Sequence, residues 1–128
     1  MTETMTLTID TKRPRMTAND QRRAHWAKVR NEKAAMETEV WLAARRARLT
    51  PITTPVRVKV VWHPPNGIHR DSDSLGPFLK AALDSLVKTG ILPDDNARHV
   101  LSTTTAIGAP DPAHPRIDIE ITPEGDPA

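Results

Sequence analysis

The stretch HRDSDSLGPFLKAALDSLVKTGILPDD, residues 69–95, places a pair of acids before an amphipathic segment and a second pair after it. Asp71 and Asp73 precede the segment, and Asp94 and Asp95 follow it. Carboxylates at both ends of one short element suggest a shared partner, and a divalent cation with a preference for oxygen ligands is a good candidate. The rest of the chain is interpreted around this stretch.

The segment between the acids has the pattern of a helix over residues 77–88. Proline is well tolerated in the first turn of a helix, so Pro77 suits the start. Gly90 suits the position after the last turn, where the backbone often takes a positive φ. The apolar residues between them recur with helical period: Phe78, Leu79, Ala82, Leu83, Leu86 and Val87.

Four other stretches have the pattern of strands. Residues 56–62 (VRVKVVW) and 116–121 (RIDIEI) alternate apolar and polar side chains, which is typical of strands with one buried face. Residues 5–9 alternate in the same way, and residues 98–107 are rich in β-branched side chains. We therefore expect four strands in one small sheet.

A long helix is predicted over residues 20–49, because this stretch contains neither proline nor glycine. Thr17 or Asn19 would cap it, and the loose apolar stripe would allow a break near Asn31. The order β-α-β-α-β-β predicts an α+β fold, with two main helices on a small mixed or antiparallel sheet. We expect a single domain over residues 1–128, with a disordered polar tail at 122–128.

The composition excludes several classes of protein. The chain has no cysteine, which rules out disulfides and thiolate metal sites. It also lacks the run of roughly 18 apolar residues that a membrane-spanning helix needs. These features favour a soluble protein of the cytoplasm.

The positive charge is concentrated in the first third of the chain. Eleven lysines and arginines lie between Lys12 and Arg48 against four acids, although the net charge of the whole chain is only +2. Such a concentration indicates a polyanion as partner, phosphate above all. A solvated helix face is the more ordinary explanation of charge counts alone.

Asp71 and Asp73 are the most promising metal ligands. In an extended segment their side chains would point the same way, about 6.5 to 7 Å apart at the backbone, and could share one cation. Without cysteine or a suitably spaced histidine pair, magnesium or manganese is favoured over zinc. Beside a basic surface, such a site could hydrolyse phosphodiesters, with Lys80 stabilising the transition-state charge.

Each of these features also has a structural explanation. A D-x-D after a Pro-Asn-Gly turn is usually a solvated turn, and Asp73 could complement the dipole of the following helix. Lys80 and Asp84 could form a surface ion pair four residues apart. The functional interpretation therefore depends on the combination of these features.

That combination resembles the RusA family of Holliday junction resolvases, which occur in phages and prophages. The family pattern is D-x-D-N, a lysine, D-A-L, a glycine and a D-D pair. Here it reads Asp71-Ser72-Asp73-Ser74, Lys80, Asp84-Ser85-Leu86, Gly90 and Asp94-Asp95. The strands at 56–62 and 116–121 and the position of Asn19 also fit the family layout, so the resemblance covers nearly the whole chain.

The resemblance implies that Asp71, Asp73 and Asp95 are catalytic metal ligands and that Lys80 is the functional lysine. Two departures stand out. Ser74 replaces the family's asparagine, and seven residues separate Asp73 from Lys80 where the best-known form has four. These departures leave open a protein of the same fold that binds nucleic acid without cleaving it. A structural or partner-binding phage protein with a merely solvated acidic stretch is a third alternative.

The resemblance further implies a homodimer that uses Mg²⁺, or Mn²⁺ as a substitute, to make paired nicks in a four-way DNA junction during recombination and repair. The setting would be the cytoplasm of a bacterial host, with a phage as one source of the gene. The basic residues would hold DNA phosphates: Arg13, Arg15, Arg22, Arg23, Lys28 and Arg70.

The position of Asp95 raises a geometric question. A helix over residues 77–88 is roughly 18 Å long, so one ion cannot bridge its two ends. Five extended residues from Ile91 reach about 17 Å, which allows Asp95 to return to the start of the helix. We expect this return within one subunit, while a contribution of Asp95 from a second subunit is the alternative.

Overall fold

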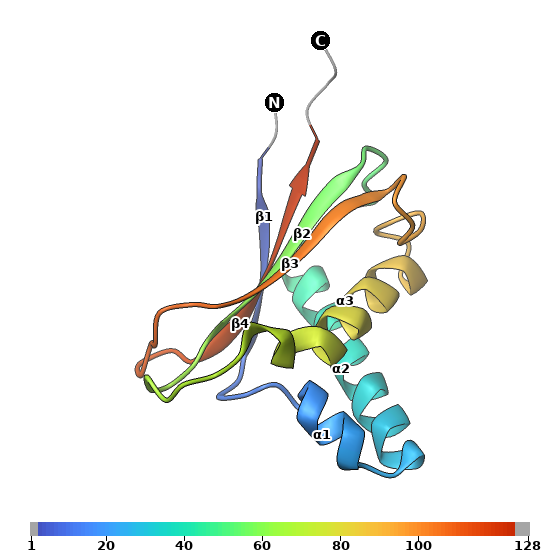
Figure 1. Cartoon of the computed structure of the whole chain (residues 1–128). Helices are drawn as coiled ribbons and strands as arrows, with labels where there is room; N and C mark the ends of the chain where they lie inside the picture. The colour runs from blue at the N-terminus through green and yellow to red at the C-terminus, as the bar shows by residue number, and fades with distance from the viewer. Residues whose placement is uncertain (1–2, 125–128) are drawn as a thin grey trace.

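Four strands form one sheet, and the helices cover one of its faces (Figure 1). The structure is a computed structural model that describes residues 3–124. Its elements in chain order are β1 (Met5–Asp10), α1 (Ala18–Arg23), α2 (Trp26–Arg46), β2 (Val56–His63), the 3₁₀ turn η1 (Ser72–Leu75), α3 (Gly76–Lys88), β3 (Val100–Ile107) and β4 (Arg116–Pro123). The predicted α+β class and the order β-α-β-α-β-β, with two main helices, are confirmed.

The sheet is mixed, with strand order β1-β4-β2-β3. The strand β4 lies antiparallel between β1 and β2, whereas β3 runs parallel to β2. Parallel neighbours need a crossover connection, and η1 with α3 supplies it. The acidic stretch therefore lies in the crossover between two adjacent strands.

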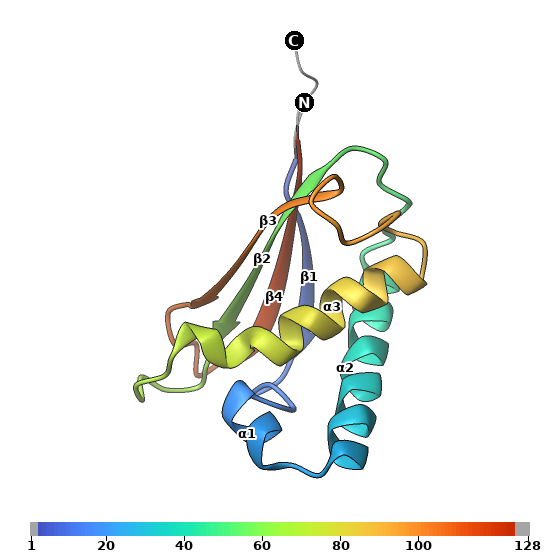
Figure 2. The same cartoon turned by 45° about the vertical axis from the view of Figure 1, so that its right-hand side comes forward.

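The core lies between the sheet and the helices α2 and α3, which contact each other extensively (Figure 2). Val58, Val60 and Ile119 are almost completely buried on the inner face, while Arg57 and Lys59 point to the exposed face, as the period-two pattern predicts. Phe78 of α3 is 1% exposed and fills the centre of this layer. The apolar stripe of α3 thus anchors the crossover to the sheet.

The predicted long helix is in fact two helices, and no break occurs near Asn31, which lies inside α2. The break falls at Ala24 and His25, whose backbones are extended. The side chain of His25 accepts a hydrogen bond from the backbone N–H of Ala27 at 3.1 Å and so caps α2. Thr17 caps α1, as one of the two predicted candidates, and Asp20 completes a capping box with it.

The helix α3 begins at Gly76, one residue before the predicted start, and ends at Lys88 as predicted. Gly90 follows with φ of +82°, which confirms its role as the residue that terminates the helix. At the end of α2 the same role falls to Arg48, at φ of +56°.

The C-terminal strand extends further than predicted. Thr122 and Pro123 belong to β4, and the N–H of Glu124 donates to the carbonyl of Pro55 at 2.7 Å. Residues 125–128 of the expected tail lie outside the described part of the chain. Within residues 3–124, none of the helices combines the length and apolar character needed to cross a membrane.

Candidate metal and phosphate site

An open cavity of about 440 Å³ lies between α1 and the acidic loop before α3. Both predicted metal ligands of this loop, Asp71 and Asp73, line it. From α1 come Asn19 and Arg22. The complete lining is Thr17, Ala18, Asn19, Arg22, Trp62, His69, Arg70, Asp71, Asp73 and Ser74. Carboxylates and guanidinium groups therefore share one solvent-filled space.

A turn rather than an extended segment brings the two aspartates to this cavity. Asp71 is extended, with φ of −96° and ψ of 137°, but Asp73 lies within the 3₁₀ turn that follows. The N–H of Ser74 donates to the carbonyl of Asp71 at 3.1 Å and closes this turn. The assumption that both residues lie on one extended strand is wrong, although both still line the same cavity.

The loop before the aspartates is held by Arg70. Its guanidinium donates to the carbonyls of Asn66 and Ile68 at 3.0 and 2.7 Å and to the side chain of Asn66 at 2.9 Å. It also stacks 4.8 Å above the ring of Trp62. The structure thus gives Arg70, a predicted DNA contact, a local role in shaping the wall of the cavity.

Trp62 connects this wall to the basic turn near the N-terminus. Its indole N–H donates to the carbonyl of Lys12 at 3.2 Å, and the residue is 5% exposed. Trp62 was predicted only as a core residue of a strand, and its position at the end of that strand, next to the acidic loop, was the available signal for a second role.

His69 lies beside the first aspartate, with Nε2 3.5 Å from Oδ1 of Asp71. Both side chains are largely exposed, at 92% and 78%. The carboxylate of Asp71 therefore retains most of its capacity to accept other partners.

Asp95 lies elsewhere, in a chain of ion pairs between α2, α3 and the loop after α3. Nζ of Lys80 lies 3.5 Å from Oδ2 of Asp95 and 3.3 Å from Oδ1 of Asp84. The second oxygen of Asp84 lies 2.6 Å from Nζ of Lys33. The loop from Ile91 does return along α3, but only as far as the ammonium group of Lys80.

These contacts change the pKa values of the residues involved. Asp84, and to a smaller extent Asp95, raise the pKa of Lys80 above its ordinary value, because hydrogen bonds and negative charge favour the ammonium form. Burial alone would raise the pKa of Asp84, but the hydrogen bonds of Lys33 and Lys80 outweigh it and lower that pKa. Lys80 and Asp84 thus stabilise each other's charged forms.

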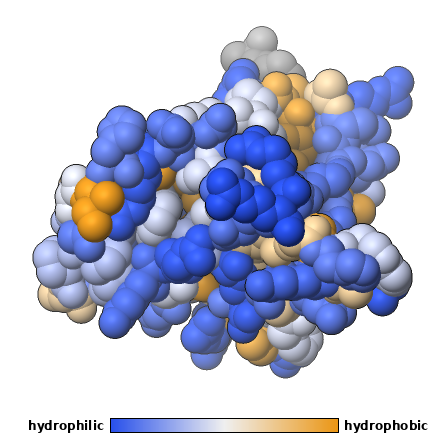
Figure 3. Space-filling model, turned by 60° about the horizontal axis from the view of Figure 1, so that its bottom comes forward, coloured by the Kyte–Doolittle hydropathy of each residue, from blue (hydrophilic) through white to orange (hydrophobic). Residues whose placement is uncertain are grey.

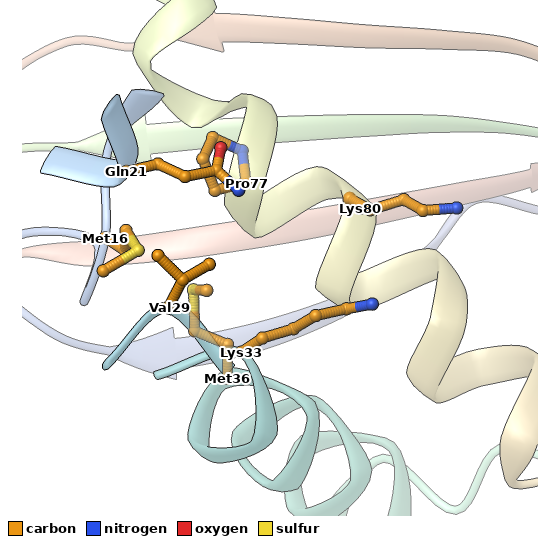
Figure 4. Close-up of a pocket in the computed structure, with 7 residues that line it drawn as sticks. All are labelled: Met16, Gln21, Val29, Lys33, Met36, Pro77 and Lys80. Atoms are coloured by element: carbon orange, nitrogen blue, oxygen red, sulfur yellow. The ribbon is translucent and has the colours of Figure 1, made fainter. Parts of the chain in front are cut away.

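The side chain of Lys80 points away from Pro77 and runs alongside Lys33, past a small cavity of about 130 Å³ (Figure 4). Within residues 3–124 its ion pairs are with Asp84 and Asp95, which is different from a contact with the acids at the start of the helix. Asp84 explains the difference, since it lies one turn further along α3 and attracts both lysines. No local sequence signal marks Lys33 as a partner, because it lies on another helix.

The three predicted metal ligands do not come together within the described chain. Across residues 3–124, no three acidic or histidine side chains are grouped so that they could hold a metal ion. Asp71 and Asp73 share a cavity, whereas Asp95 is paired with Lys80. The expectation of a three-carboxylate site within one subunit is not met, and a contribution from a second subunit stays a prediction.

The open cavity nevertheless suits a hydrated divalent cation. Magnesium usually retains several waters and needs only one or two carboxylates, which Asp71 and Asp73 supply. The amide of Asn19, on α1, adds a potential oxygen ligand in the same cavity. The hydroxyl oxygen of Ser74 is buried and has no hydrogen-bond partner among residues 3–124. The oxygen-rich lining is thus chemically compatible with Mg²⁺ or Mn²⁺.

Apart from Arg70, the predicted basic residues fall into two groups. Arg13 pairs with Asp20 at 2.7 Å, and Arg15 pairs with Glu39 at 3.0 Å and Glu32 at 3.4 Å. The hydrogen bonds and charge of these glutamates, mainly Glu39, raise the pKa of Arg15. The local positive charge is therefore smaller than the residue count suggests.

The second group consists of Arg22, Arg23 and Lys28, which form no ion pair with the acids of residues 3–124. Arg23 and Lys28 line a further cavity of about 260 Å³, together with Arg13 and Arg15. This part of the surface, brought forward in Figure 3, is mostly hydrophilic. It is the surface best placed to accept phosphates beside the acidic cavity.

Comparison with known proteins gives no relative: no family model matches the chain, and no curated protein matches it significantly.

Proposed function

We propose that this protein is a metal-dependent endonuclease that hydrolyses phosphodiester bonds of branched DNA, with a four-way junction as substrate. One observation carries the proposal: Asp71 and Asp73 share an open cavity with Arg22. Metal-assisted phosphodiester hydrolysis needs carboxylates that can hold a divalent metal ion next to a positively charged side chain that can hold a phosphate. The sequence resemblance to the RusA family supports the choice of a branched substrate.

Asp71 and Asp73 would hold Mg²⁺ or Mn²⁺ in this proposal. Such an ion supplies Lewis-acid activation of water and offsets the negative charge that develops on the phosphate. Arg22 would orient the scissile phosphate, and Arg70 would keep the loop in place through Asn66 and Trp62. Arg23 and Lys28 would bind phosphates further along the strand.

Lys80 and Asp95 have a different status in this proposal. Their contact with each other and with Asp84 keeps both groups occupied in the single chain. We propose that they reach the reacting phosphate only in a homodimer on DNA, where the second subunit can change their surroundings. A two-fold dimer matches a junction with two-fold symmetry and allows paired nicks.

The test is cleavage of a labelled four-way junction in the presence of Mg²⁺, with the wild-type chain and Asp73→Asn. The wild type should nick the junction in pairs, and EDTA should stop the reaction. Asp73→Asn should bind the junction as the wild type does but lose nearly all cleavage. Absence of Mg²⁺- or Mn²⁺-dependent cleavage by the wild type would refute the proposal.

A second candidate is a protein that binds nucleic acid without cleaving it. The observation in its favour is that Asp95 pairs with Lys80 and leaves only two carboxylates in the cavity. Its predicted result is salt-dependent junction binding with no cleavage under any divalent metal. The same assay therefore separates the two candidates.

A further inference from the structure

Trp26, the first residue of α2, is unusually exposed. As an apolar residue at the start of a helix it could pack against the sheet, but 64% of its surface is accessible. Exposing a large aromatic side chain to water is unfavourable in the free protein, so its surface is available to a partner. The question is which partner the surroundings of this ring would accept.

The ring already contacts one cationic and one aromatic side chain. The guanidinium carbon of Arg30 lies 4.8 Å from the centroid of the Trp26 ring. The imidazole of His25 lies 5.3 Å from it at an interplanar angle of 35°, and its cap on Ala27 fixes its position. The ring is therefore oriented before any partner arrives, which reduces the entropy lost on binding.

The charges around the ring favour an anion. Arg22 and Arg23 precede Trp26 at the end of α1, and Lys28 follows it. None of the three pairs with an acid among residues 3–124, in contrast to Arg13 and Arg15. The unpaired cations attract a polyanion and release its counterions when they bind it.

The apolar surface here is small. None of the other large hydrophobic side chains that are exposed in residues 3–124 lies within residues 22–30. They are Trp41, Leu42, Ile68 and Leu101. Protein interfaces and membrane-binding faces need contiguous apolar area, which a single ring among charged residues does not provide. An aromatic ring among cations is instead typical of sites that bind unpaired bases and their phosphates.

We infer that Trp26 and Arg30, with the unpaired cations Arg22, Arg23 and Lys28, form a binding site for an unpaired segment of a nucleic-acid strand. A base stacks on the indole ring, and the neighbouring phosphates contact the three cations. This site shares Arg22 with the acidic cavity, but it requires neither a metal ion nor cleavage. It stands even if the chain binds DNA without cutting it.

The chain offers a matched control in Trp41. This residue also lies on α2 with an arginine over its ring, since Arg45 is 5.1 Å from the centroid. It is less exposed, at 38%, and lines a cavity with the apolar residues Leu49 and Ile91. Arg45 and Arg46 near Trp41 also form no ion pair with the acids of residues 3–124, so the two tryptophans differ mainly in how far the ring is exposed.

The test measures binding of a fluorescent oligothymidylate and of a blunt duplex of equal length, by anisotropy, with EDTA present to prevent cleavage. The wild type should prefer the single strand, and its affinity should fall steeply with salt. Trp26→Ala should weaken single-strand binding about tenfold and duplex binding much less. Trp26→Phe should restore part of the loss, and Trp41→Ala should bind as the wild type does.

Three results would overturn the inference. One is equal single-strand affinity in Trp26→Ala and the wild type. Another is an equal loss for single strand and duplex, which would reduce Trp26 to a structural role. The third is a change of oligomeric state in Trp26→Ala with unchanged DNA binding, which would assign the ring to contact with a second copy of the chain. Because EDTA is present, failure here is independent of the cleavage assay.

Discussion

The aspartates before α3, Asp71 and Asp73, differ from Asp84 and Asp95 in the side chains that neutralise their charge. Asp71 and Asp73 line an open cavity, and the one basic side chain within 4 Å of Asp71 in the described chain is an exposed histidine. Asp84 is largely buried and lies between two lysines, one of which also contacts Asp95. A carboxylate with protein partners stabilises the fold, whereas one without them is available to an external cation. Acids of one short stretch thus have separate roles, which their surroundings decide.

The largest difference is expected in catalysis. Asp71→Asn and Asp73→Asn should each lower the rate of junction cleavage by about 10²–10³-fold, because each removes an anionic ligand of the metal ion that would stabilise the transition state. Asp84→Asn should lower it far less, since that carboxylate is outside the cavity. Single-turnover cleavage at saturating Mg²⁺ measures all three variants. Equal losses in all three would remove the distinction between the two groups.

Stability should show the opposite order. Asp84→Ala should lower the free energy of unfolding by about 1 kcal/mol, because Lys33 and Lys80 both lose their partner. Asp71→Asn should change it by less than about 0.5 kcal/mol, as expected for an exposed side chain. Urea unfolding at neutral pH gives both values, and a larger loss in Asp71→Asn than in Asp84→Ala would contradict the comparison.

The pH dependence of stability should reflect the lowered pKa of Asp84. A carboxyl group whose pKa is lower in the folded than in the unfolded chain stabilises the fold above its ordinary value of 3.8. This contribution is lost as the pH falls below that value and through the lower folded pKa. The difference in unfolding free energy between wild type and Asp84→Asn should therefore shrink from pH 6 to pH 2.5. A difference that stays constant over this range would show that the ionised form of Asp84 is not what stabilises the fold.

The smallest effect is expected from Lys80→Gln. Lys80 is 62% exposed, and Asp84 retains its 2.6 Å contact with Lys33 when Lys80 is replaced. The loss of unfolding free energy should be a few tenths of a kcal/mol, less than that of Asp84→Ala. Thermal unfolding of the two variants side by side measures the order, and a larger loss in Lys80→Gln would make Lys80 the centre of the ion-pair chain.

The sequence predicts the parts of the fold that depend on local pattern. The alternation in residues 56–62 and 116–121 places Val58, Val60 and Ile119 on the buried face, and the structure agrees. Pro77 and Gly90 bracket α3 for reasons of backbone conformation that act within a few residues. The break at His25 was missed because neither proline nor glycine marks it, and only the imidazole cap shows why α2 starts there.

The site is less predictable, because its contacts join distant segments. The motif correctly indicates Asp71 and Asp73 as neighbours, since the turn between them is local. It gives no indication that Lys33, 51 positions before Asp84, would form an ion pair with that acid, which also contacts Lys80. The partner of Asp95 depends on the path of the loop after α3. The number of residues in this loop limits how far it can reach but does not determine its direction.

The most direct test of the central claim is a titration with Mn²⁺ followed by electron paramagnetic resonance of the free ion. The account predicts that wild type and Asp84→Asn bind Mn²⁺ with similar affinity and that Asp71→Asn and Asp73→Asn bind it at least about tenfold more weakly. Affinity that is unchanged in Asp71→Asn and Asp73→Asn, or lost in Asp84→Asn, would contradict the claim that the open pair holds the cation.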